Sequence, residues 1–287
     1  MRIYPLFVYF TTFAIMISAN QPIGIFDSGI GGLTVANAIA KTLPHEDFIY
    51  FGDIAHLPYG DKSPDTIRYY SLRIAKFLMD QNCKMVVVAC NSASTAANNV
   101  LLEFFQDRCH FVNVVDPLVD ACIDKQLNKV GIIATKATIS SNVYQKQLRS
   151  GQANLMIHAK ATPLFVPMIE EGFVHNNISH SIIENYLSDP GFKDMEALLL
   201  ACTHYPLIKS SIQQYLGDKV EVLESSELAA KAVLKTLEKE GLLNSKKEKG
   251  QHKFFVSDLT DSFAQTARYF YGEDIELAHH PLWEDRP

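Results

Sequence analysis

Two cysteines, Cys90 and Cys202, stand in matching sequence positions that suit acid–base chemistry. Each follows an apolar run and an alanine, and each precedes an Asn or Thr that can open a helix, in MVVVACNSAS and ALLLACTHYP. The positive end of a helix dipole and its unpaired N–H groups favour a thiolate over a thiol. We therefore expect a modestly lowered pKa, so that one thiolate and one thiol on opposite faces of a carbon atom could invert it.

Two aspartates follow apolar runs in the part of the chain that supplies Cys90. They are Asp27, in the segment DSGIGG, and Asp53, in FGDIAHLPYG. At strand ends such carboxylates could help manage the thiol proton, although an Asx turn explains Asp53 equally well from its local sequence. The glycines after Asp27 would let backbone N–H groups approach an anion.

His204 lies two residues beyond Cys202, close enough for its imidazole to share a proton network with the thiol. A lone histidine is more often a satisfied polar residue, so its neighbours carry the argument. Glu170, in FVPMIEEG, is a candidate partner, and the spacing does not separate it from Glu171.

Short apolar runs alternate with amphipathic stretches from Pro22 onward, which is typical of βαβ units around a parallel sheet. The predicted strands are Ile23–Phe26, Asp47–Phe51, Met85–Ala89, Val112–Val115, Val130–Ala134, Leu155–Ala159, Ala197–Ala201, Val220–Leu223 and His252–Val256. The carboxyl ends of such strands are where open α/β sheets bind ligands.

The sequence also repeats itself. Three segments of the first part resemble three of the second, each pair about 110 residues apart: IGIFDSGIGG and VGIIATKATI, MVVVACNSAS and ALLLACTHYP, and VNVVDP and VEVLES. This predicts two similar doubly wound α/β domains related by a pseudo-two-fold axis, with a site between them.

The composition of the chain disfavours several classes of function. The 287 residues suffice for two domains, and the net charge of −6 disfavours a nucleic-acid groove. Five cysteines without a CxxC pair indicate neither a zinc site nor a disulfide framework, and Cys83, Cys109 and Cys122 are expected to be buried hydrophobic residues. Neither GxGxxG nor GxxxxGK occurs, so no nucleotide cofactor is indicated.

Residues 1–21 form an N-terminal extension with an apolar run, Leu6–Ala19, after Arg2. We favour an over-extended start, with Met16 as the true first residue, or a disordered tail. An export signal is the third interpretation, but the run is short for a span of roughly 20 residues and lacks a clear cleavage site.

Six blocks together resemble the glutamate racemases of bacterial cell-wall synthesis: GIFDSGIGG, YFGDIAHLPYG, VVVACNSAST, GIIATKAT, FVPMIEEG and LLLACTHYPL. The resemblance spans Ile23 to about Phe270. It implies two α/β domains that close over glutamate, with no metal or other cofactor. The first domain would comprise residues 22–113 and 223–287, and the second residues 114–222. It also implies a cytoplasmic enzyme without membrane or nucleic-acid partners, with a homodimer among its oligomeric states.

The same resemblance assigns roles to residues. Cys90 would deprotonate D-glutamate with help from Asp27 and Asp53. Cys202 would deprotonate L-glutamate with help from Glu170 and His204. The implied substrate-binding residues are Asp27, Ser28, Pro58, Tyr59, Gly60, Asn91, Ser92, Thr135 or Thr138, Thr203 and His204. Two positions depart from the family pattern: Ser92 replaces the usual Thr, and Glu224 the usual Asp.

Three other functions remain open at this stage. An aspartate racemase or related isomerase would share the fold and both thiols. A non-catalytic amino-acid-binding protein would agree with an export signal. A thiol redox protein is disfavoured because the two cysteines lack CxxC spacing.

We predict that Cys90→Ser or Cys202→Ser leaves the fold intact and lowers racemisation in both directions by about 100-fold or more, because each direction needs one base and one acid. Circular dichroism of the protein and polarimetry of the amino acid measure the two effects. Near-normal turnover by either variant would contradict the assignment.

Overall fold

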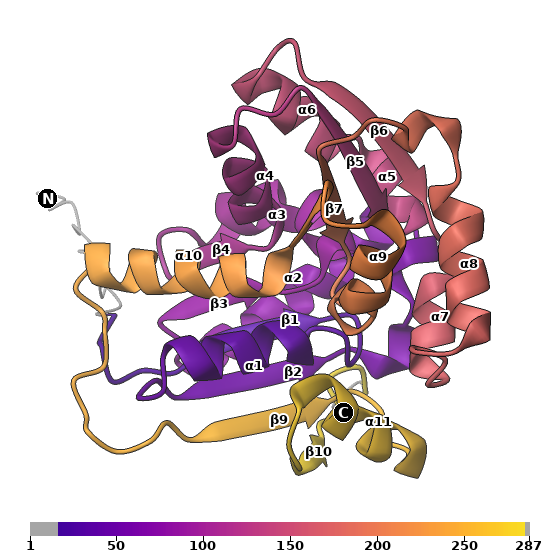
Figure 1. Cartoon of the computed structure of the whole chain (residues 1–287). Coiled ribbons are helices and arrows are strands. Elements are labelled where there is room, and N and C mark those ends of the chain that lie inside the picture. Colours follow the sequence, from indigo (N-terminus) through magenta and orange to yellow (C-terminus); the bar gives the residue numbers. More distant parts are fainter. Residues whose placement is uncertain (1–16, 285–287) are drawn as a thin grey trace, which may run out of the picture.

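The structure is a computed structural model that describes residues 17–284, without the side chains of residues 261 and 262. Within this part, the strands form two sheets, and every strand pair is parallel (Figure 1). One sheet has six strands in the order β10-β9-β2-β1-β3-β4, and the other has four in the order β6-β5-β7-β8. The predicted α/β architecture with two parallel sheets is confirmed.

The strands of the first sheet are β1 (Ile23–Asp27), β2 (Phe48–Gly52), β3 (Met85–Val88), β4 (His110–Asn113), β9 (His252–Val256) and β10 (Leu277–His279). Those of the second are β5 (Lys129–Ala134), β6 (Met156–Ala161), β7 (Ala197–Ala201) and β8 (Glu221–Glu224). The helices are α1 (Leu33–Thr42), α2 (Pro64–Asp80), α3 (Asn91–Phe105), α4 (Val115–Asp124), α5 (Lys136–Ser141), α6 (Val143–Gly151), α7 (Phe165–Glu170), α8 (Asn177–Leu187), α9 (Lys209–Leu216), α10 (Ser225–Lys239) and α11 (Asp261–Tyr271).

The burial of the central strands explains why these strands could be predicted from the sequence. Every residue of β1, β2, β3 and β7 is buried, so these segments are continuous apolar runs, as expected for parallel strands covered on both faces. The edge strands β6, β8 and β10 are only partly buried. Their patterns are correspondingly weaker.

One predicted strand was displaced by two residues, and one strand was not predicted. The predicted strand Val112–Val115 ends at Asn113, because the Asn113 side-chain oxygen accepts the N–H groups of Val115 and Asp116 at 2.9 Å and so starts α4. The three-residue strand β10 was missed altogether. It is too short and too exposed to show an apolar alternation.

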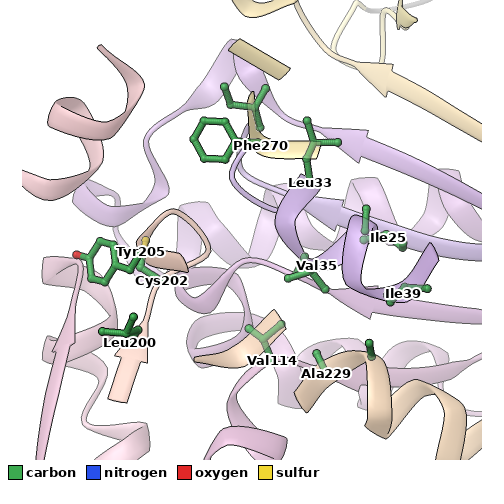
Figure 2. Packing of buried hydrophobic residues seen from close by; sticks show 14 of the residues in the cluster. Ile25, Leu33, Val35, Ile39, Val114, Leu200, Cys202, Tyr205, Ala229 and Phe270 are labelled. Atoms are coloured by element: carbon green, nitrogen blue, oxygen red, sulfur yellow. The ribbon is translucent and has the colours of Figure 1, made fainter. Parts of the chain in front are cut away.

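A single apolar cluster connects the two sheets (Figure 2). It runs from Ile25 and α1 of the first sheet, past Val114 and Ala229, to Leu200 and Cys202 of the second. Helix α10, which follows the last strand of the second sheet, packs on α1 (Figure 1). The two sheets therefore share a core, and the boundaries proposed for two domains remain a prediction.

No helix within residues 17–284 is both long enough and apolar enough to cross a bilayer. The three interpretations of the N-terminal extension concern residues 1–16 above all, and these lie outside the described part.

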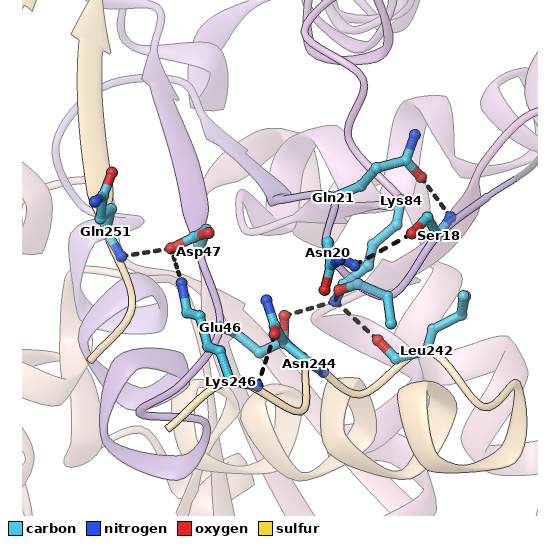
Figure 3. A network of polar contacts seen from close by, with 11 residues as sticks. Ser18, Asn20, Gln21, Glu46, Asp47, Lys84, Leu242, Asn244, Lys246 and Gln251 are labelled. Atoms are coloured by element: carbon cyan, nitrogen blue, oxygen red, sulfur yellow. Dashed lines mark hydrogen bonds and ion pairs between the residues drawn. The ribbon is translucent and has the colours of Figure 1, made fainter. Parts of the chain in front are cut away.

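A buried ion pair lies at the amino ends of β2 and β3 (Figure 3). The Lys84 ammonium contacts the Glu46 carboxylate at 2.6 Å, and both side chains are almost fully buried. It also donates to the carbonyls of Ala19 and Leu242 at 2.6 and 2.8 Å, while the second Glu46 oxygen accepts the Asn244 N–H at 2.7 Å. The pair thus fixes the segment between α10 and β9 to the first sheet.

We predict that Lys84→Met lowers the free energy of unfolding by about 3–5 kcal/mol, because it leaves the Glu46 carboxylate buried without its cation. Urea unfolding measures the loss. Lys76→Met is the matched control, since it removes an exposed partner of Asp80 and should cost less than about 1 kcal/mol. Similar small losses in both variants would show that Lys84 is not structurally important.

Candidate active site

Cys90 and Cys202 line the same pocket, at the carboxyl ends of β3 and β7. Both side chains are buried, at 5% exposure each. The pocket is small, with a cavity volume of about 40 Å³, and lies between loops of the two sheets. Its lining residues are Ser28, Gly29, Leu57, Pro58, Tyr59, Gly60, Cys90, Asn91, Ser92, Thr135, Val166, Glu170, Cys202, Thr203 and His204.

Cys90 is the N-cap residue of α3. Its sulfur accepts the Ala93 N–H at 3.4 Å and lies 3.7 Å from the Ser28 hydroxyl oxygen. Burial nevertheless raises the pKa of Cys90 to about 12, and the neighbouring Asp27 acts in the same direction, against the Ala93 N–H and the Ser28 hydroxyl. The expected lowering of this pKa was therefore wrong, because desolvation outweighs the helix terminus.

Cys202 has different neighbours. Its sulfur lies 3.9 Å from Nδ1 of His204, and Nε2 of the same ring lies 2.9 Å from a Glu170 carboxylate oxygen. Burial acts to lower the pKa of His204, but hydrogen bonds to Cys202 and Glu170 oppose it and raise this pKa to about 10. Of the two adjacent glutamates, Glu170 is the one that joins the pocket, whereas Glu171 is exposed.

The two aspartates are placed differently. Asp27 is fully buried, and one of its carboxylate oxygens accepts the Gly29 N–H at 3.0 Å while the other has no partner in the described structure. Burial raises the pKa of Asp27, and His204 opposes the rise. Asp53 is also buried but does not line the pocket, and its carboxylate accepts hydrogen bonds from other side chains instead.

Several hydrogen bonds join the two sides of the pocket. The Tyr144 hydroxyl donates to the Asn91 side-chain oxygen at 2.6 Å, and the Ser92 and Thr135 hydroxyls lie 3.0 Å apart. The Asn91 side-chain nitrogen is buried without a partner. Thr138 does not line the pocket and lies behind Thr135, with 3.2 Å between the hydroxyl oxygens.

The absence of a side chain at Gly31 allows the two sides of the pocket to approach each other. A methyl group on Gly31 would lie 2.4 Å from the His204 ring and 2.6 Å from the Thr203 hydroxyl. Beside it, the Thr34 hydroxyl donates to the Thr203 carbonyl at 3.0 Å.

The sequence predictions thus included most of the residues that line the pocket and missed some of the residues that support it from outside. Of the residues proposed for the site, Asp27, Asp53 and Thr138 lie outside the lining. Thr34 and Tyr144 were missed, since each sits on an ordinary amphipathic helix and only the packing of the two sheets brings it to Thr203 or Asn91. No group of three or more His, Cys, Asp and Glu side chains within residues 17–284 could hold a metal ion.

Comparison with known proteins places this chain in a family. Residues 31–233 match the model of the Asp/Glu/Hydantoin racemases. The chain belongs to this family. A glutamate racemase of Geobacter metallireducens is 41% identical over 88% of this chain and 93% of its own length. One from Chlorobaculum tepidum is 39% identical over 91% of this chain and 97% of its own.

Solved racemase structures agree with the fold. A glutamate racemase from Francisella tularensis, crystallised with D-glutamate, superposes with a TM-score of 0.87 at 39% identity, over 92% of this chain and 99% of that one. One from Thermus thermophilus, crystallised with β-chloro-D-alanine, gives 0.83 at 40% identity, over 92% and 98%. An aspartate racemase from Picrophilus torridus, at 22% identity and a TM-score of 0.53, shares the fold only.

We predict that alkylation of Cys90 in this racemase rises about tenfold per pH unit between pH 7 and 9.5, because a thiol with a pKa of about 12 is almost entirely protonated in that range. Iodoacetamide labelling in the Cys202→Ser background, followed by peptide mass spectrometry, gives the rate. A plateau near pH 8 would mean that the helix terminus dominates after all. Peptides carrying Cys83 serve as an internal control for unfolding, since this thiol is buried away from the pocket.

Proposed function

We propose that this chain is a cofactor-independent glutamate racemase, an isomerase that interconverts L-glutamate and D-glutamate and supplies D-glutamate for peptidoglycan. The observation that carries the proposal is the pair of buried thiols in one pocket of a racemase-family fold. The glutamate racemases to which the chain is similar over nearly their whole length support the substrate.

The reaction needs an acid and a base on opposite faces of the α-carbon. When D-glutamate binds, the Cys90 thiolate takes the α-proton, and Cys202 gives its thiol proton to the other face. The electron pair left at the α-carbon is held as an enolate-like carboxylate and then forms the new C–H bond. L-glutamate is converted by the same steps in reverse, so both directions leave one thiol and one thiolate.

The neighbours of each sulfur support distinct roles. On the Cys90 side, Asp27 has one unpartnered carboxylate oxygen and a raised pKa, which suits it to receive the thiol proton before catalysis. On the Cys202 side, the imidazole of His204, held by Glu170, can carry a positive charge that stabilises the Cys202 thiolate.

Charge that develops on the substrate carboxylate needs donors aimed at it. Asn91 presents a buried side-chain nitrogen with no partner, and the hydroxyls of Ser92, Thr135 and Thr203 border the same pocket. Such donors are worth more in an enclosed site than in water. We assign substrate binding to these residues together with Ser28, Pro58, Tyr59 and Gly60. The enzyme is proposed to act in the cytoplasm.

Exchange of the α-proton tests this function. In deuterated buffer we expect L-glutamate and D-glutamate each to acquire deuterium at the α-carbon, because the acid that reprotonates the intermediate carries a solvent-derived proton. NMR measures the exchange, and circular dichroism the change of configuration.

The alternatives predict other results. Exchange and inversion of aspartate but not glutamate would identify an aspartate racemase, and binding without exchange a non-catalytic binding protein. The Cys90→Ser/Cys202→Ser double variant is the matched control and should leave the α-proton in place. A chain that starts at Met16 shows whether the first fifteen residues are needed.

A further inference from the structure

Asp53 is fully buried behind the pocket and is surrounded by side-chain donors. Nδ1 of His56 lies 3.0 Å from its Oδ1, and the Ser257 hydroxyl and the Trp283 indole N–H donate to the same oxygen at 2.8 and 2.7 Å. The Tyr59 hydroxyl donates to Oδ2 at 2.6 Å. Nδ1 of His56 also lies 3.1 Å from Oδ2, so it is shared between the two oxygens. A carboxylate offers about four acceptor sites, two on each oxygen, and these four side chains occupy them.

One of these donors comes from the other end of the sequence. Trp283 belongs to residues 280–284, which we call the C-terminal strap. The backbone N–H of residue 280 donates to the Val256 carbonyl at 2.8 Å, and an Arg73 N–H donates to the Leu282 carbonyl at 2.9 Å. The strap is therefore fastened to the first sheet and to α2 just before the position of Trp283.

Aromatic contacts hold the indole ring itself. The ring meets His56 edge-on at a centroid distance of 4.6 Å and Tyr70 at 5.1 Å, and the Arg73 guanidinium lies 5.4 Å from its centroid. Contacts of this kind fix the direction of the indole N–H. The bond to Asp53 is thus made by a side chain with little freedom to leave it.

Asp53 connects the strap to the pocket. Its neighbour in the chain is the loop that supplies Leu57, Pro58, Tyr59 and Gly60 to the pocket lining. Tyr59 is buried and hydrogen-bonded to Asp53, so the position of this carboxylate determines where the loop lies. Trp283 does not line the pocket, and it reaches the pocket residue Tyr59 through the carboxylate of Asp53 and through the ring of Tyr70.

We propose that Trp283 is a positioning residue for the substrate pocket: its indole N–H completes the hydrogen bonds of Asp53, and Asp53 in turn fixes the loop Leu57–Gly60. This rests on the proposed racemase function. It also gives Asp53 a different task from the one that the family resemblance implies, since Asp53 serves the loop rather than the Cys90 thiol.

The test removes the N–H and keeps the aromatic ring. In Trp283→Phe we expect the KM for both glutamate enantiomers to rise about fivefold while kcat changes less than about twofold, because a displaced loop weakens substrate binding in both directions. A purely structural role would instead reduce the amount of active enzyme, which lowers the apparent kcat and leaves KM unchanged.

Two further variants sharpen the result. Glu284→Gln changes the exposed neighbour of Trp283 and should behave as wild type. Because Trp283 is the only tryptophan, an unchanged fluorescence emission in that variant shows that the strap is in place. Ser257→Ala removes another donor to the same Asp53 oxygen, together with the acceptor of the Ala55 N–H at 3.0 Å, without touching the strap. It should raise KM as Trp283→Phe does, which keeps the test open if the latter folds poorly.

Hydrogen exchange separates this proposal from the function it rests on. Amides of residues 54–62 should exchange faster in Trp283→Phe than in wild type or Glu284→Gln, whether or not the wild type racemises glutamate. An inactive wild type would refute the racemase function and leave this measurement valid. Unchanged loop exchange together with an unchanged KM in both Trp283→Phe and Ser257→Ala would overturn the positioning role.

Discussion

The burial of two thiols in one pocket is the constraint on which the rest of the structure depends. Burial excludes water, which protects a carbanion-like intermediate and strengthens every donor aimed at it. The same burial disfavours charge, and it raises the pKa values of Cys90 and Asp27. A pocket built this way needs neighbouring groups that decide which thiol is charged.

Those groups differ on the two sides, although the sheets repeat one another. The Cys90 side offers a carboxyl group and the amino end of α3, whereas the Cys202 side offers the His204–Glu170 pair. Burial and Asp27 raise the pKa of the Cys90 thiol, whereas on the other side the pKa of His204 is raised to about 10 by its hydrogen bonds to Cys202 and Glu170. The two sulfurs therefore lie in electrostatically different surroundings. The ammonium group of a bound amino acid would add a further positive charge to the pocket.

The local sequence was sufficient to predict the central strands and the position of the two cysteines at their ends. The buried central strands and the two cysteines at their ends were predicted, because continuous apolar runs followed by helix-opening residues are distinctive over ten residues. The pKa of Cys90 was not predicted, since it depends on how deeply the folded chain buries the sulfur. The hydrogen-bond partners of Asp53 could not be predicted either. Ser257 and Trp283 are more than two hundred residues away in the sequence, and nothing near Asp53 points to them.

The two ends of the first sheet are stabilised by different kinds of interaction. At the amino ends of its strands, the Lys84–Glu46 pair is fully buried and could be separated only at a large electrostatic cost. At the carboxyl ends, the two sides of the pocket meet through neutral hydroxyl and amide groups such as Ser92, Thr135 and Thr34. Water can replace these hydrogen bonds at a net cost of about 1 kcal/mol each. The polar contacts that join the two sides of the pocket are therefore easier to break than the ion pair at the opposite ends of the strands.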